Sequence, residues 1–247
     1  MQLIGGSLPP ARSWQPGEEL KTKIRDHTAT LGVIGLGYVG LTLAIEMAQR
    51  GFRVTGIDID GSKVESVNAG VSYVLDVPSH AVSSAVADGT LRATQSLAAL
   101  ELVDSIHICV PTPFRKTKYP DLSYLVAALE AVHNHLSPEK LIVVESTIYP
   151  GTTRELILPI LERSGFKAGK DFFLAFSPER MDPGNKIYTT HNIPKIIAGV
   201  TPRCTKMALL LYQEIVEAII AVSSTESAEM VELLENTFRS VNIGIVK

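Results

Sequence analysis

A glycine-rich segment offers the first recognisable chemistry in this 247-residue sequence. Residues Gly35-Leu36-Gly37-Tyr38-Val39-Gly40 have the spacing GxGxxG, which is typical of turns that bind the pyrophosphate of a dinucleotide. In such a turn Gly35 permits a sharp change of direction, Gly37 lets backbone N–H groups approach the phosphates, and Gly40 lets the next helix pack on the strand. The spacing alone also fits an ordinary glycine-rich turn.

An acidic residue stands at the distance expected for a nucleotide ribose. Asp58 ends the next apolar stretch, about 20 residues after the glycines, where a carboxylate accepts hydrogen bonds from the adenosine ribose. A carboxylate at this position repels a 2′-phosphate, so the sequence favours NAD over NADP. Lys63 follows soon after and is expected to reach a phosphate or a ribose edge.

Two further turns carry hydroxyl groups where strands of an open α/β sheet would end. The first is Val110-Pro111-Thr112-Pro113, whose prolines end a strand and leave Thr112 at the sheet edge. The second runs from Glu145 through Ser146 and Thr147 to Pro150-Gly151-Thr152-Thr153. Such edges commonly bind ligands, but the same residue types also favour a plain turn followed by a helix cap, and local chemistry does not separate the two.

Strands and helices alternate from Leu31 onward, which indicates βαβ units and a parallel sheet. Strands are predicted at 31–34, 53–57, 91–94, 105–110, 141–145, 172–175, 195–198 and 218–222. Helices are predicted at 39–49, 62–69, 81–87, 122–135, 153–163 and 202–212. The expected fold class is α/β, with a Rossmann-type, doubly wound and mainly parallel sheet.

Three regions are expected along the chain. Residues 1–28 have the Pro and Gly content of an irregular lead, with a short helix at 18–26. Residues 29–222 form the dinucleotide-binding domain, and 223–247 begin a long helix that is still running at Lys247. Because a domain rarely ends inside an amphipathic helix, the sequence predicts a truncated chain.

Composition excludes several classes of protein. The net charge of −3 gives no basic excess for a nucleic-acid partner. No stretch reaches the roughly 20 apolar residues that span a bilayer, and the start lacks the regions of a signal peptide. Two cysteines are too few for a disulfide framework, and no metal-ligand spacing occurs. A cytoplasmic protein without metal or membrane partner is expected.

Several motifs in series resemble the UDP-glucose/GDP-mannose dehydrogenase family. They are Gly35 to Gly40, Asp58, Val110-Pro111-Thr112-Pro113, Ser146-Thr147 with Pro150-Gly151-Thr152, Phe176-Ser177-Pro178-Glu179-Arg180 with Pro183-Gly184, and Leu234-Glu235-Asn236-Thr237-Phe238-Arg239. The Ser-Pro-Glu-Arg and Asn-Thr-Phe-Arg blocks look most like the branch acting on UDP-N-acetylglucosamine or UDP-N-acetylmannosamine. The match covers about residues 28–247, and it is the combination of motifs that is specific.

The resemblance implies a chemistry and a set of roles. Such enzymes oxidise the sugar C6 alcohol to a carboxylate with two NAD molecules, through a thioester on a cysteine, and supply polysaccharide precursors. It implies cofactor contacts from the residues Gly35, Gly37, Tyr38, Val39, Gly40, Asp58, Lys63, Thr112 and Thr147. It implies that Thr147 positions the water or sugar hydroxyl, that Glu179 acts as base, and that Asn236 steadies the oxyanion. It implies substrate contacts from Glu179, Arg180, Met181, Asn236 and Arg239.

This sequence departs from the family pattern at important positions. Glu232 stands where the family has a lysine, and a carboxylate there opposes developing negative charge. The resemblance places the nucleophilic cysteine beyond Lys247, and neither Cys109 nor Cys204 is in the matching motif. Thr42 replaces a usual proline, a mild change. The resemblance also implies that the last helix links two domains and forms the interface of a homodimer.

Three functions remain in view from the sequence. The leading one is the NAD-binding portion of a nucleotide-sugar 6-dehydrogenase, inactive alone. A second is a non-catalytic binding or regulatory module that pairs with an intact dehydrogenase. A third, a two-electron dehydrogenase of the 6-phosphogluconate or hydroxyacid kind, is disfavoured because such enzymes lack the Ser-Pro-Glu-Arg and Asn-Thr-Phe-Arg blocks.

Overall fold

A single eight-stranded sheet organises the computed structural model, which describes residues 17–113, 120–180 and 193–246. The strand order is β3-β2-β1-β4-β5-β6-β7-β8. The strands are β1 (Thr30–Ile34), β2 (Arg53–Ile57), β3 (Leu91–Thr94), β4 (Ser105–Ile108), β5 (Leu141–Val144), β6 (Phe173–Phe176), β7 (Lys195–Gly199) and β8 (Ile219–Ala221). The first six run parallel, β7 is antiparallel to β6, and β8 is parallel to β7. The expected doubly wound, mainly parallel α/β fold is confirmed.

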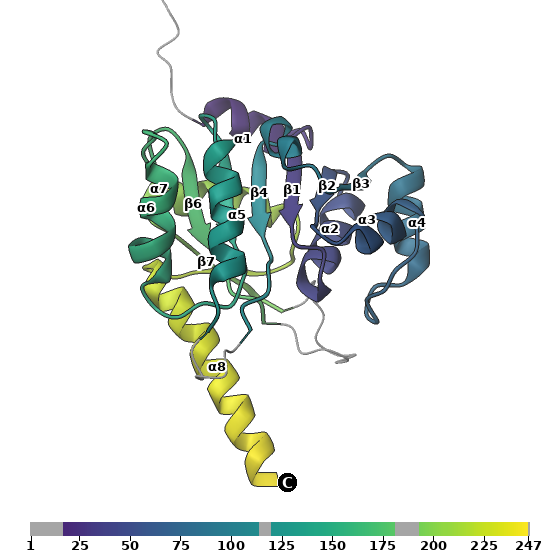
Figure 1. The fold of residues 1–247 in the computed structure, drawn as a ribbon. Helices are drawn as coiled ribbons and strands as arrows, with labels where there is room; N and C mark the ends of the chain where they lie inside the picture. The colour runs from purple at the N-terminus through teal and green to yellow at the C-terminus, as the bar shows by residue number, and fades with distance from the viewer. Residues whose placement is uncertain (1–16, 114–119, 181–192, 247) are drawn as a thin grey trace, which may run out of the picture.

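Helices connect and cover the strands on both faces of the sheet (Figure 1). They are α1 (Glu18–Arg25), α2 (Tyr38–Gln49), α3 (Gly61–Asn68), α4 (Ser79–Ala87), η1 (Leu97–Leu102), α5 (Ser123–Asn134), η2 (Thr153–Ile157), α6 (Leu158–Glu162), α7 (Pro202–Gln213) and α8 (Thr225–Val246). This cover explains why β4, β5 and β6 are buried along their whole length. Strands covered on both sides carry near-continuous apolar runs instead of alternating ones.

The strand order reverses beside β1, which lies between β2 and β4. The connection from β1 leads to one neighbour, and the chain later returns to place β4 on the other side. A crevice opens at such a reversal, outside the carboxyl ends of the strands. Figure 1 shows that the tips of β1 and β4 point toward the end of the molecule from which α8 projects.

Some element boundaries differ from the expectation. The single helix predicted over 153–163 is instead a π-helical turn, η2, followed by the short α6. Pro159 lies at the start of α6 and has no N–H to donate to a preceding carbonyl, which breaks the regular helical pattern. The 3-10 helix η1 was not predicted, and β4 ends at Ile108 instead of Val110.

Helix α1 lies within the segment expected to be an irregular lead. It begins after Gly17, which adopts a left-handed backbone with φ of 85°. Its Leu20 and Ile24 are buried, and the helix contacts α7. The packed unit therefore begins before residue 29.

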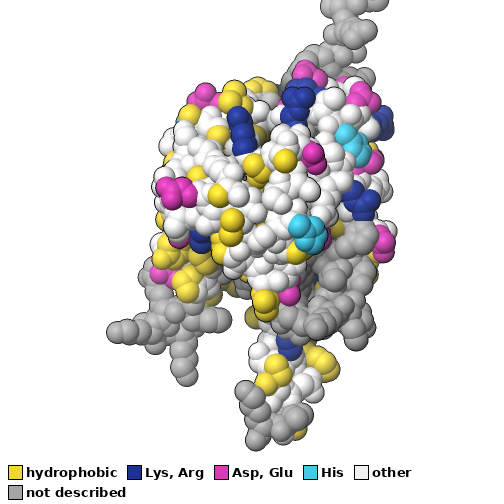
Figure 2. All heavy atoms as spheres, turned by 90° about the vertical axis from the view of Figure 1, so that its right-hand side faces the viewer, with side chains coloured by type: hydrophobic (Ala, Val, Ile, Leu, Met, Phe, Trp, Pro, Cys, Tyr) yellow, Lys and Arg dark blue, Asp and Glu magenta, His cyan; other side chains and the backbone are white. Residues whose placement is uncertain are grey.

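The surface carries mixed charge on the side drawn in Figure 2. Lysine and arginine side chains alternate there with aspartate and glutamate, and no patch of one sign dominates the described residues of that face. Among the described residues, no helix is long and apolar enough to cross a membrane.

Helix α8 is anchored to the domain by a buried carboxylate. Glu229 accepts hydrogen bonds from the backbone N–H groups of Gly151 (2.6 Å) and Thr153 (2.8 Å), at the start of η2. Beyond Glu232, which is also buried, the helix becomes exposed, with Leu234 at 64% and Phe238 at 71%. The first turns of α8 thus belong to the domain, and the rest projects from it (Figure 1).

Replacing Glu229 by alanine should loosen this anchor. Two buried N–H groups lose their acceptor, which costs about 2–4 kcal/mol of unfolding free energy. Urea denaturation of Glu229→Ala measures the loss. Met230→Ala is the matched control, because Met230 is 49% exposed on the same helix and its truncation should cost less than about 1 kcal/mol. Equal losses in both variants would contradict the anchoring role.

Candidate functional site

The glycine-rich turn brings backbone, not side chains, to the crevice. Gly35 has φ of 89°, and a Cβ atom on it would lie 2.7 Å from the carbonyl oxygen of Cys109. A Cβ on Gly40 would lie only 1.8 Å from the carbonyl oxygen of Gly35. Gly37 has no atom within 4 Å of the corresponding position. Gly35 and Gly40 are therefore required by packing, whereas Gly37 leaves open space at the N-terminus of α2.

Asp58 holds this turn in place. Its Oδ2 accepts a hydrogen bond from the N–H of Leu36 (2.7 Å), and its Oδ1 accepts one from the N–H of Asp60 (2.9 Å). Lys63 Nζ lies 3.4 Å from Oδ2. The carboxylate thus supports the turn as well as facing the crevice, a second role that the sequence did not reveal. Lys63, expected to reach a phosphate or ribose, contacts Asp58 here.

A cavity of about 680 Å³ joins the predicted residues into one site. At one end it is lined by Asp58, Asp60, Lys63 and Gln95, and at the other by Ser146, Thr147 and Glu179. Of the residues implied for the cofactor, it is lined by Gly35, Gly37, Tyr38, Val39, Asp58, Lys63, Thr112 and Thr147. Gly40 packs beneath the turn. The volume and the residues that line it suit a dinucleotide lying across the reversal in strand order.

Two tyrosines brace the loop beside the glycine-rich turn, and sequence reasoning missed both contacts. The hydroxyl of Tyr73 donates to the carbonyl oxygen of Leu36 (2.6 Å), and the hydroxyl of Tyr38 donates to Asp76. Burial and the nearby Asp58 raise the pKa of Tyr73 well above its ordinary value. The tyrosine therefore stays a neutral donor and ties the 70–78 loop to the edge of the cavity.

A buried ion network lies at the Thr147 end. Lys195 Nζ, at the start of β7, donates to Glu145 Oε2 (2.6 Å) and to Glu179 Oε2 (3.1 Å). The hydroxyl of Tyr212 also donates to Glu145, and His107 Nδ1 lies 3.3 Å from the same carboxylate. Lys195 was not singled out from the sequence, because its partners lie far away along the chain.

The network fixes the charges of its members. Burial would raise the pKa of Glu145, but Lys195 and His107 lower it below its ordinary value. Burial would likewise lower the pKa of Lys195, but Glu145 and Glu179 raise it above its ordinary value. One ammonium group is thus shared by two carboxylates, and Glu179 is held at the cavity wall by this contact.

The residues that the resemblance implies for substrate binding do not all line the same cavity. Arg180 donates to both carboxylate oxygens of Glu235 (2.6 and 2.9 Å) and to the carbonyl oxygen of Pro194 (2.8 Å). Arg180 and Arg239 line a separate groove of about 690 Å³ along α8. Asn236 is exposed on α8 and does not line the cavity, and Met181 lies outside the described residues.

Glu232 is a buried carboxylate on α8. Its side chain is 2% exposed, and neither carboxylate oxygen has a hydrogen-bond partner of normal geometry among the described residues. Burial raises its pKa to about 7, although the nearby Thr147 hydroxyl and Lys195 lower it in part. A buried carboxylate without a counter-charge favours its protonated form.

Neither cysteine is placed as a nucleophile. Cys109 borders the cavity, but it is buried, and burial raises the pKa of its thiol well above the ordinary value. Cys204 is fully buried in α7, where its sulfur lies 3.4 Å from the N–H of Leu174. Among the described residues, no group of three or more His, Cys, Asp or Glu side chains could hold a metal ion.

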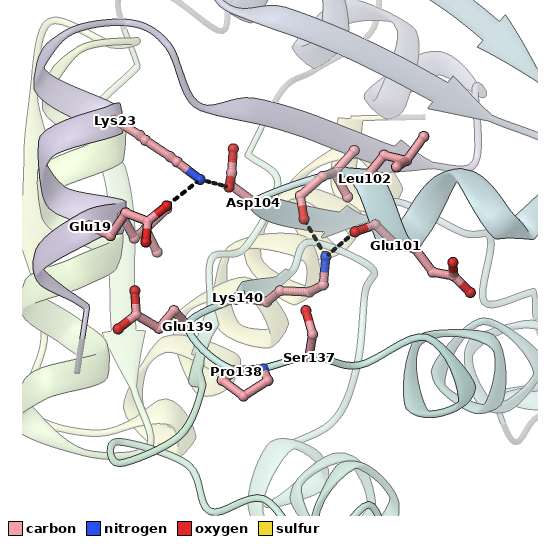
Figure 3. Close-up of a pocket in the computed structure, with 11 residues that line it drawn as sticks. Glu19, Lys23, Glu101, Leu102, Asp104, Ser137, Pro138, Glu139 and Lys140 are labelled. Carbon is pink, nitrogen blue, oxygen red and sulfur yellow. Dashed lines mark hydrogen bonds and ion pairs between the residues drawn. The ribbon is translucent and has the colours of Figure 1, made fainter. Parts of the chain in front are cut away.

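A second cavity, of about 390 Å³, lies at the opposite edge of the sheet (Figure 3). Both lysines that line this cavity already have partners in the domain. Lys23 pairs with Glu19 and Asp104, and Lys140 donates to the backbone carbonyls of Leu100, Glu101 and Val103. These contacts hold α1 and the end of η1 to the sheet, so this cavity serves packing.

A model of the UDP-glucose/GDP-mannose dehydrogenase family, NAD binding domain, matches residues 29–216. The chain belongs to the UDP-glucose/GDP-mannose dehydrogenase family. Its cofactor is NAD, and the open space at Gly37 and the carboxylate of Asp58 fit that nucleotide.

Individual relatives extend this assignment. The UDP-N-acetyl-D-glucosamine 6-dehydrogenase of Pseudomonas aeruginosa is 36% identical over 218 residues, 87% of this chain and 51% of the relative. The solved UDP-D-ManNAc dehydrogenase from Pyrococcus horikoshii is 36% identical, with a TM-score of 0.82 over 87% of this chain and 52% of that one. The GDP-mannose dehydrogenase of P. aeruginosa, solved as a ternary complex, is 27% identical with a TM-score of 0.80 over 86% of this chain and 50% of that one. The chain spans about half the length of these relatives.

Removing the shared cation should destabilise the domain. Lys195→Met leaves Glu145 buried beside Glu179 without a counter-charge, which costs about 3–5 kcal/mol of unfolding free energy. Urea denaturation at pH 7 measures the loss. The double variant Glu145→Gln/Lys195→Met should be more stable than Lys195→Met, because it also removes the unpaired negative charge of Glu145. A single-variant loss below about 1 kcal/mol would show that the network contributes little.

Glu232 should make stability depend on pH. Its pKa is about 7 in the folded chain against an ordinary 4.5, so between these values the folded state binds more protons than the unfolded state. Stability therefore falls as pH rises from 5 to 8, with a contribution of about 3 kcal/mol. The isosteric Glu232→Gln should match wild type near pH 5 and exceed it at pH 8 in urea denaturation.

The matched control for this pH series is Glu226→Gln. Glu226 lies on the same helix and pairs with Arg154 at 2.9 Å, so its replacement should leave the fall of stability between pH 5 and 8 in place. A Glu232→Gln variant that shows the same fall as wild type would disprove the assignment of this titration to Glu232.

Proposed function

We propose that this chain is the NAD-binding half of a dehydrogenase that oxidises the C6 alcohol of a UDP-N-acetylhexosamine. The observation that carries the proposal is the single cavity that runs from Gly37 and Asp58 to Thr147 and Glu179. It joins the glycine-rich turn to polar side chains that can form hydrogen bonds with an alcohol or accept its proton. Relatives named as UDP-N-acetyl-D-glucosamine and UDP-N-acetyl-D-mannosamine dehydrogenases support the sugar class.

We propose residue roles that the resemblance implies, and the cavity lining supports those of Thr147 and Glu179. When bound, NAD accepts hydride from the carbinol carbon. Thr147 lies at the cavity end and would position the sugar hydroxyl or a water. Glu179, held by Lys195, would act as base. Arg180 and Arg239, which line the groove along α8, would contact the nucleotide part of the substrate, and Asn236 would approach the site only from the exposed face of α8.

We further propose that the chain alone binds NAD but oxidises little sugar nucleotide. Oxidation to the carboxylate requires a nucleophile that holds the aldehyde, and both cysteines are buried, with the pKa of the Cys109 thiol raised. NADH formation from UDP-N-acetylglucosamine and UDP-N-acetylmannosamine tests this directly. Rapid formation of two NADH per sugar by the purified chain would contradict the proposal. Co-purification with a longer dehydrogenase, without turnover, would favour a regulatory module instead.

NAD binding itself is tested at Gly37. The backbone there has φ of −75° and open space, so Gly37→Val should fold normally while filling the approach to the turn. We expect NAD affinity to fall at least tenfold by calorimetric titration. Gly244→Val is the matched control, because Gly244 also has no neighbour at its Cβ position and lies far along α8. Unchanged affinity in folded Gly37→Val would place the nucleotide elsewhere.

A further inference from the structure

Four glutamates at intervals of three residues form a stripe along the first turns of α8. They are Glu226, Glu229, Glu232 and Glu235. Three of them have partners in the domain: Arg154 for the first, the N–H groups of Gly151 and Thr153 for the second, and Arg180 for the fourth. Glu232 is buried, as Glu229 is, but it has no hydrogen-bond partner among the described residues. Such a buried, unpaired carboxylate requires an explanation.

The surroundings of Glu232 point toward the NAD cavity. Thr147 faces it from the loop after β5, Glu179 from the loop after β6, and Lys195 from β7, while Glu229 lies one turn earlier on the same helix. Thr147 and Glu179 also line the cavity. Lys195 is already shared by Glu145 and Glu179, so it does not neutralise a further carboxylate.

The position of Asp58 determines which part of NAD reaches this end. With the adenosine ribose at Asp58 and the pyrophosphate at the glycine-rich turn, the nicotinamide extends toward Thr147, past the point beside β1 where the strand order reverses. The nicotinamide ring carries a positive charge in the oxidised nucleotide and none in the reduced one. A carboxylate behind Thr147 therefore interacts differently with the two forms.

We propose that Glu232 determines how strongly this site prefers oxidised over reduced nucleotide. This inference rests on the proposed NAD site. The ionised carboxylate stabilises the charged ring of NAD+, whereas the protonated acid favours neither form. Because coupling is reciprocal, binding of NAD+ releases the proton of Glu232 and binding of NADH does not. The raised pKa of Glu232, about 7, places this effect in the neutral range.

The test measures the dissociation constants of NAD+ and NADH for the whole chain between pH 6 and pH 8.5. In wild type, the ratio of the NADH constant to the NAD+ constant should rise about tenfold across this range, a coupling of ordinary size. In Glu232→Gln the ratio should not change with pH. Glu226→Gln should behave as wild type, because its carboxylate is paired with Arg154 outside the cavity.

A second measurement needs no variant and remains available if Glu232→Gln fails to fold. Calorimetry of the wild-type chain at pH 7, in two buffers of different ionisation enthalpy, counts the protons exchanged on binding. About half a proton should be released with NAD+, and none with NADH.

Two results would overturn the inference while leaving the NAD site intact. One is a nucleotide preference that does not change with pH in wild type, and the other is an equal pH dependence in wild type and Glu232→Gln. If the folded wild-type chain binds neither nucleotide, the proposed function fails as well.

Discussion

The close approach of helix α2 to the sheet is the constraint on which the nucleotide site depends. No Cβ atom fits at Gly40, because the carbonyl oxygen of Gly35 lies where it would stand, and the turn itself packs against the carbonyl of Cys109. This contact brings the N-terminus of α2 to the carboxyl ends of β1 and β4. Asp58 then fixes the turn by accepting the N–H of Leu36. At such a turn, backbone N–H groups and the helix dipole can bind an anion without a cationic side chain.

Ion pairs organise the opposite end of the cavity. Glu145 directly follows β5, Glu179 lies in the loop after β6, and Lys195 begins β7. They meet because these three strands are neighbours in the sheet. The antiparallel direction of β7 places the start of that strand beside the ends of β5 and β6. Lys195 therefore reaches the edge where ligands bind. In a fully parallel sheet, a lysine at the start of a strand would lie at the opposite edge.

Local patterns predicted most of the fold, and they predicted the glycine-rich turn and the acidic residue that the structure brings to one cavity. The β1–turn–α2 unit and Asp58 lie within a short stretch, so the glycine spacing together with the neighbouring strands, the helix and the acid indicates their arrangement. The Lys195–Glu145 contact, with partners 50 residues apart, has no such signal, and the contact of Tyr212 with Glu145 spans 67 residues. Pro159 was a local signal for the break between η2 and α6, but helical periodicity on both sides concealed it.

The charge balance around Glu232 makes this position important for the Thr147 end of the cavity. The resemblance placed a cation there, which would have given the cavity end two positive groups for Glu145 and Glu179. With a carboxylate instead, one ammonium of Lys195 faces three acids. In a buried site such an excess of negative charge is removed by a proton or by a positive group that enters the cavity. On the proposal above, the carboxylate at this position would favour a cationic ligand, where the resemblance implies a group that stabilises a developing anion.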